Sequence, residues 1–144
     1  MAVVSTLSNH LKYQTMAKAI DFSSDEFRMI LMKDTFAFDK DTHATYLDVS
    51  GEEIPAGSGY TSRGIEMLSG EFTEDDVNDK GKMVWSHNPT WTASGGSIGP
   101  AGAAVLFDET SSDDTVVGCI DFGADYTATE GQSIRVMSGE VGLS

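Results

Sequence analysis

The sequence predicts a mainly β protein: a single-domain antiparallel β-sandwich or barrel of about eight short strands, with an N-terminal helix and one short extra helix. Short apolar stretches rich in β-branched and aromatic residues recur at close spacing along the chain. The chain has 15 glycines and only 3 prolines, so its turns are built mainly from Gly, Asp, Asn and Ser. Two of the apolar stretches are apolar on both faces, which is typical of strands inside a covered sheet.

Those two stretches, residues 102–107 and 116–122, flank a polar loop of turn formers and therefore predict a hairpin. In the first of them, Ala103, Val105 and Phe107 alternate with Ala104 and Leu106. Because successive side chains of a strand point to opposite faces, both faces of this hairpin are expected to be buried. We therefore expect it at the middle of the core.

The N-terminal region predicts a short arm over residues 1–8 and a helix over 9–21, capped by Ser8 or Asn9. Four residues at helical spacing form the stripe expected to pack on the sheet: Tyr13, Met16, Ala17 and Ile20.

The β-sandwich is expected over residues 26–144. Its first strand is expected over 26–33, with Phe27, Met29 and Leu31 on one face and Ile30 and Met32 on the other; a helix is the competing interpretation.

The remaining elements follow from the same criteria. Thr42 is a candidate cap for the short extra helix over 43–49. The glycine-rich segments 50–59 and 95–102 are expected as loops, and residues 123–125 as a turn. A further strand is expected within residues 60–69, and others over residues 71–77, 82–86, 133–137 and 140–143.

Length and charge narrow the class of protein. A chain of 144 residues suits one domain. With 23 acidic against 9 basic residues, its net charge is −14, so phosphate backbones and anionic membrane surfaces would repel it. We therefore expect neither nucleic acid nor a membrane as a partner. No run has transmembrane length, and the N-terminus lacks the pattern of a secretory signal.

No catalytic, cofactor or metal site is expected from the residues. The single cysteine, Cys119, lies in an apolar strand and is expected as a buried thiol. A calcium loop starting at Asp39 fails, because Ala44 occupies the position that requires glycine. The three histidines lack the spacing of a zinc site; they are His10, His43 and His87.

Trp91 has two interpretations. Such a tryptophan usually plugs the end of a sandwich, with its indole N–H bonded to backbone, and we prefer that interpretation. Alternatively, an exposed Trp91 with Tyr60 would stack on a sugar ring.

Several phrases, in order along nearly the whole chain, resemble a family of small tailed-phage virion proteins. They are Ala19-Ile20-Asp21, the strand over 27–33, Gly59-Tyr60-Thr61-Ser62-Arg63-Gly64, Trp91-Thr92-Ala93-Ser94, the strand over 103–107, Ile120-Asp121-Phe122-Gly123 and Leu143-Ser144. The glycine-rich segment 95–102 departs from the family pattern.

The resemblance implies a non-enzymatic virion component, made in the host cytoplasm and bound to the capsid surface as a head decoration or cement protein. The major capsid protein or another virion protein is the expected partner, and self-association is expected, for which a trimer suits quasi-symmetric axes. The arm is expected to add a strand to a neighbour, with contacts from Met1, Ala2, Val3, Val4 and Leu7. The alternative is a tail or fibre adsorption module that binds a host glycan through Tyr60 and Trp91.

Overall fold

The computed structural model describes residues 3–137 and 139–143, and confirms a mainly β, sandwich-like fold that is not a closed barrel. No helix in those residues is long and apolar enough to cross a membrane. The elements are β1 (Thr6–Leu7), α1 (Asn9–Met16), β2 (Phe27–Lys33), α2 (Tyr46–Val49), the 3₁₀ turn η1 (Ser50–Glu52), β3 (Ile65–Glu66), β4 (Gly70–Asp75), β5 (Lys80–Trp85), β6 (Thr90–Thr92), β7 (Ile98–Asp108), β8 (Val116–Ala128), β9 (Ser133–Arg135) and β10 (Glu140–Leu143).

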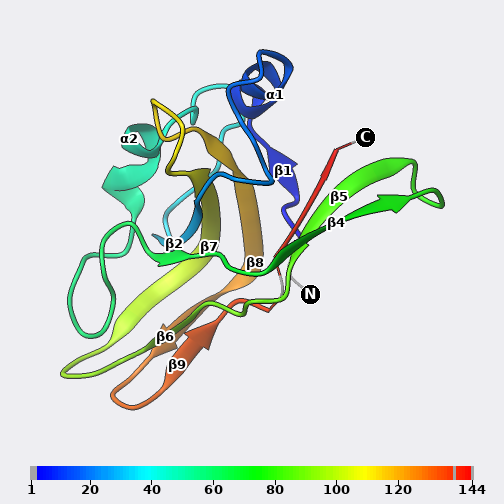
Figure 1. Cartoon of the computed structure of the whole chain (residues 1–144). Helices are drawn as coiled ribbons and strands as arrows, with labels where there is room; N and C mark the ends of the chain where they lie inside the picture. The colour runs from blue at the N-terminus through cyan, green and yellow to red at the C-terminus, as the bar shows by residue number, and fades with distance from the viewer. Residues whose placement is uncertain (1–2, 138, 144) are drawn as a thin grey trace.

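The strands form one large antiparallel sheet and two small ones. The large sheet has the order β1-β8-β7-β2-β3, and the small sheets are β10-β5-β4 and β6-β9 (Figure 1). The predicted hairpin is confirmed as β7 and β8, which form the middle of the large sheet. Both strands are longer than the sequence suggested.

The central part of the large sheet, over β2, most of β7 and the first half of β8, is buried on both faces, as its sequence predicts. The inner core lies between this sheet and the small sheets, and it contains Ala104 and Leu106 from β7. The outer core lies on the other face, under α2 and the loop before it, and contains Ala103, Val105 and Phe107. Figure 1 shows α2 and the β4–β5 pair on opposite sides of β2, β7 and β8.

Strand β2 repeats this division. Phe27, Met29 and Leu31 lie in the inner core, whereas Ile30 and Met32 lie in the outer core. The strand interpretation of this segment is therefore confirmed.

A β-bulge at the start of β8 lets the side chains of this strand face the same cores as their partners on β7. Phe107 pairs with Val116, but Leu106 pairs with Gly118, so Val117 is an extra residue on β8. Val116 consequently faces the outer core, while Val117 faces the inner core. A Cβ atom on Gly118 would lie 2.4 Å from the Thr6 carbonyl oxygen, so the close approach of β1 requires glycine there.

Two predictions for the N-terminal helix are wrong, and one strand is shorter than its predicted segment. The helix predicted over 9–21 ends at Met16, because Lys18 has a left-handed φ of 62°. Its predicted packing stripe is wrong at three of its four residues: Tyr13, Met16 and Ala17 are exposed, whereas Ile20, beyond the helix, is buried in the inner core. Leu11 is the buried residue of α1. The strand expected within residues 60–69 is confirmed as β3, which has only two residues because Arg63 and Gly64 also have positive φ.

The other differences concern loops and caps. The short helix starts at Tyr46 instead of residue 43, because Thr45 and Asp48 form a capping box. The segment 98–102, expected as part of a loop, belongs to β7, and the turn expected at 123–125 is a bulged part of β8. The strand expected over 133–137 is confined to Ser133–Arg135.

We predict that neighbouring residues of β7 are equally critical, because they fill different cores. Leu106→Ala and Phe107→Ala should each lower the free energy of unfolding by ~2–5 kcal/mol, measured by urea denaturation. Leu47→Ala, on an α2 residue that is 82% exposed, is the matched control and should change it by less than ~0.5 kcal/mol. Two mild effects at positions 106 and 107 would contradict a sheet that is covered on both faces.

Candidate functional site

The small sheet β10-β5-β4 extends beyond the core that it covers (Figure 1). Its register places three rows of residues on the inner face. In the first row, Trp85 lies between Gly70 and Gly139, and it is buried. In the second row, Met83 pairs with Phe72 on one side and with Val141 on the other.

The third row lies outside the core. Gly81 pairs with Glu74 and with Leu143, and a Cβ atom on Gly81 would have no neighbour within 4 Å among the described residues. Open space therefore remains above this glycine. Phe72, in the adjoining row, is 58% exposed although its neighbour Met83 is buried.

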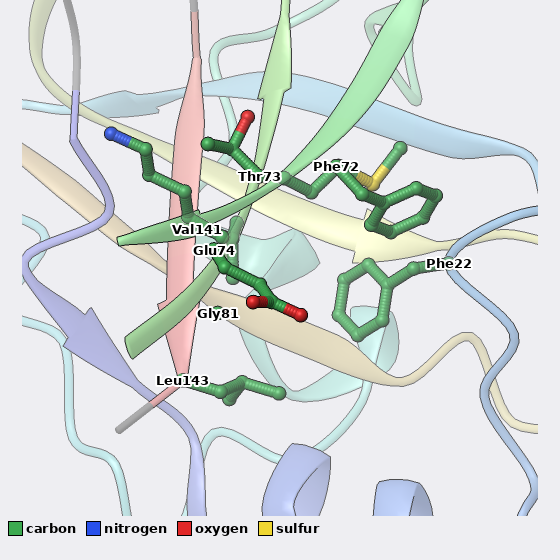
Figure 2. Close-up of a pocket in the computed structure, with 9 residues that line it drawn as sticks. Phe22, Phe72, Thr73, Glu74, Gly81, Val141 and Leu143 are labelled. Carbon is green, nitrogen blue, oxygen red and sulfur yellow. The ribbon is translucent and has the colours of Figure 1, made fainter. Parts of the chain in front are cut away.

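These rows form one wall of an apolar groove with a volume of about 450 Å³. The opposite wall includes Phe22, which stacks on Phe27 with ring centroids 5.0 Å apart. Figure 2 shows Phe22, Phe72, Glu74 and Leu143 around the space over Gly81. The carboxylate of Glu74 has no hydrogen-bonding or ionic partner in the part of the chain that the structure describes.

The outer face of the same sheet is polar. Lys80 forms an ion pair with Glu140 at 3.2 Å, and Lys82 forms one with Asp75 at 3.7 Å. The sheet is therefore amphipathic, with its ion pairs on the outer face, although Lys82 also lines the groove and Glu74 is an acidic residue of the inner face.

Strand β4 is a free edge with respect to residues 3–137 and 139–143. β10, at the other edge, is bridged by Val3 of the arm, and the Glu140 carbonyl accepts a hydrogen bond from the Val4 N–H. Because hydrogen-bonded pairs alternate along an antiparallel ladder, Gly70, Phe72 and Glu74 direct their backbone N–H and C=O groups away from β5. The edge and the groove thus share residues.

A buried carboxylate network lies elsewhere, between the outer core and the loop that follows η1. Glu53 accepts hydrogen bonds from the Tyr46 hydroxyl, from the Tyr60 hydroxyl at 2.7 Å and from the Arg63 N–H at 2.9 Å. The Tyr60 oxygen in turn accepts a hydrogen bond from the Leu31 N–H. Burial and the Glu53 carboxylate raise the pKa of both tyrosines, so both hydroxyls remain protonated donors.

The Arg63 side chain joins this network to the surface. Its guanidinium lies 4.6 Å from the centre of the Tyr46 ring and forms ion pairs with Glu109 at 2.9 Å and Asp114 at 3.1 Å. These contacts fix the loop to the large sheet, so the network is structural in character.

The structure separates the residues that the sequence singled out as binding candidates. Met1 and Ala2 lie outside the described residues. Val3 is partly exposed but bridges its own β10, Val4 is buried, and Leu7 belongs to β1, which pairs with its own β8. The described part of the arm thus pairs within its own chain, and its expected contacts with a neighbour stay a prediction.

Tyr60 and Trp91 lie together, with ring centroids 6.1 Å apart, but they are only 3% and 2% exposed. The core interpretation of Trp91 is confirmed, and these two rings do not form the exposed pair that a sugar would require. The expected backbone partner of the indole is wrong, because Nε1 of Trp91 has no hydrogen-bond partner among the residues described.

Cys119 is a buried thiol, as expected, and burial raises its pKa to about 12. Within the described residues, no group of three or more His, Cys, Asp or Glu side chains is arranged to hold a metal ion. Comparisons with known proteins find no matching family model, curated protein or solved structure.

We predict that the Tyr60 hydroxyl stabilises the fold. Tyr60→Phe leaves Glu53 and the Leu31 N–H each without one hydrogen-bond partner, which should lower the free energy of unfolding by ~1–3 kcal/mol in urea denaturation. Tyr13→Phe, on an exposed ring, is the control and should have no measurable effect. Equal stability of the two variants would contradict a structural role for the network.

A second buried carboxyl group, that of Asp108, predicts pH-dependent stability. Burial and the neighbouring Asp25 carboxyl raise the pKa of Asp108 from an ordinary value of 3.8 to about 8. Between these values the folded chain retains a proton that the unfolded chain has lost. This group should therefore lower the stability as pH rises from about 4 to about 8, with no further change above that range.

Asp108→Asn is the test, because its amide keeps the oxygen that accepts from the Thr110 and Ser111 N–H groups and donates a hydrogen bond as a protonated carboxyl does. Relative to this variant, the natural chain should lose stability steadily as the pH rises from about 4 to about 8. Parallel pH profiles of the two proteins in urea denaturation would show that the Asp108 carboxyl does not titrate in this range.

Proposed function

We propose that the chain is a non-enzymatic virion structural protein that binds the outside of a phage capsid in many copies. The observation that carries this proposal is the projecting β10-β5-β4 sheet, which combines an apolar groove with a free strand edge. Such an edge is a ready template for strand addition, and an exposed apolar face favours association with another protein. The family resemblance of the sequence phrases supplies the virion context.

The charge of the chain supports an outward position on the capsid. Five of its nine basic side chains already form ion pairs with acidic groups of the chain: Arg28, Lys40, Arg63, Lys80 and Lys82. Few basic side chains are therefore left to contact DNA, and packaged DNA would repel a chain with a net charge of −14. Many weak contacts repeated on a lattice hold such a protein through avidity.

The buried polar groups support a structural role. Glu53 is saturated by donors from its own chain, and Asp108 accepts two backbone hydrogen bonds that order the loop between β7 and β8. Both carboxyl groups stabilise loops, and neither lines the groove.

The alternative function, glycan binding on a tail or fibre, requires an exposed aromatic platform. The residues expected to form it, Tyr60 and Trp91, are buried against each other. We therefore prefer the head to the tail.

The proposal is tested by gold-labelled antibodies against the chain, imaged by electron microscopy on intact particles of the phage that encodes it. We expect label distributed over the heads in many copies per particle. Label confined to tails or fibres, or particles that lack the protein, would reject the proposal. Heads from a phage in which the gene is deleted provide the control for antibody specificity.

A further inference from the structure

The projecting hairpin of β4 and β5 carries three large apolar side chains that its own chain leaves uncovered. Leu68 precedes β4 and is 50% exposed, Phe72 lies on β4, and Val77, at the tip, is 91% exposed. Exposed apolar residues along an unpaired strand edge indicate a surface that another strand covers.

The alternation of inward and outward backbone groups along β4 restricts how a second β4 could pair with this edge. Only Gly70, Phe72 and Glu74 direct their backbone groups outward, so these residues of one copy must meet the same set in the other. An antiparallel pairing of two identical strands has a two-fold axis, and therefore one residue faces its own counterpart. That residue is Glu71, Phe72 or Thr73 in the three registers that keep most of the strand paired.

Charge disfavours two of these registers. A pairing centred on Glu71 places this carboxylate directly opposite its counterpart. A pairing centred on Thr73 places Glu71 opposite Asp75 at both ends of the strand. Like charges directly opposite each other destabilise a sheet.

The register centred on Phe72 has no such conflict. It places Glu71 opposite Thr73, whose hydroxyl can donate to a carboxylate, and Glu74 opposite Gly70. Asp75 falls opposite Ser69. No acidic residue of β4 then faces another acidic residue.

We propose that the partner of the β4 edge is a second copy of this chain, paired in the register centred on Phe72. The two small sheets then form one continuous antiparallel sheet, with the two Phe72 rings side by side on its inner face. Because the axis is perpendicular to the sheet, both grooves lie on that face and meet at the phenylalanines. Aromatic rings paired in this way attract each other and exclude water.

The same register also brings the two ends of each hairpin together. With Phe72 at the centre, the hairpin tip of each copy reaches the segment that precedes β4 in the other copy, and Val77 of one copy falls opposite Met67 of the other.

This inference rests on the proposed function only in treating the projecting sheet as an assembly surface. Labelling of heads tests the virion assignment, whereas the state of the purified chain in solution tests the pairing. Failure of one therefore leaves the other standing.

The first experiment is analytical ultracentrifugation of the purified chain over a range from micromolar to millimolar. We expect the average mass to rise reversibly from 15.4 kDa towards twice that value. Phe72→Glu removes the ring pair and puts like charges on the axis, so it should weaken dimerisation by at least ~100-fold. Leu47→Glu, at an exposed residue away from β4, is the matched control and should leave dimerisation unchanged.

The second experiment identifies the register by oxidative cross-linking of single cysteine variants. Residues that face each other in a ladder have Cα atoms within reach of a disulfide, about 5.5 Å apart, whereas diagonal neighbours are beyond it. Phe72→Cys should therefore form a covalent dimer under a mild oxidant, because the two thiols lose two electrons and two protons to it. Glu71→Cys and Thr73→Cys should remain monomeric on a non-reducing gel.

The two experiments test the dimer and its register separately. A mass that stays at that of the monomer up to millimolar concentration, a trimer, or a dimer that persists in Phe72→Glu would overturn the proposal. Preferential cross-linking at position 71 or 73 would overturn the register. The natural chain should not cross-link, because Cys119 is buried.

Discussion

The structure depends on one constraint: the central strands of the large sheet are apolar on both faces, so both faces must be covered. The two small sheets cover the inner face, and α2 with its preceding loop covers the outer face. The bulge at Val117 preserves this arrangement, since without the extra residue the apolar side chains that follow on β8 would change sides. The groove follows from the same arrangement, because the sheet that covers the inner face is longer than the core beneath it.

The sequence predicted best where local alternation and burial agree. The period of two assigned the side chains of β2 and of β7 to the correct faces. Prediction from the sequence was poor where tertiary contacts determine the backbone conformation. Lys18 and Arg63 adopt positive φ although neither is glycine. Arg63 is held there by Glu109, Asp114 and the Tyr46 ring, which come from distant parts of the chain.

The candidate site was missed for a related reason. Phe72 is an ordinary alternating residue of a predicted strand, and its exposure depends on which residues of β5 and β10 lie beside it. The open space arises because Gly81 pairs with Glu74 and Leu143, and that register is a property of three strands together. Tyr60 and Trp91, by contrast, were singled out as aromatic residues beside turn formers. Their burial reflects the contact between the loop after η1 and β6, which no local pattern encodes.

The position of Cys119 has a practical consequence. A thiol that is buried and titrates far above neutral pH is a poor nucleophile. Reagents that alkylate thiolates should therefore react very slowly with Cys119 in the folded protein. Any cysteine introduced on the surface is then the single reactive handle of the chain. Dyes, spin labels or cargo can be attached at one chosen position without first removing the natural residue.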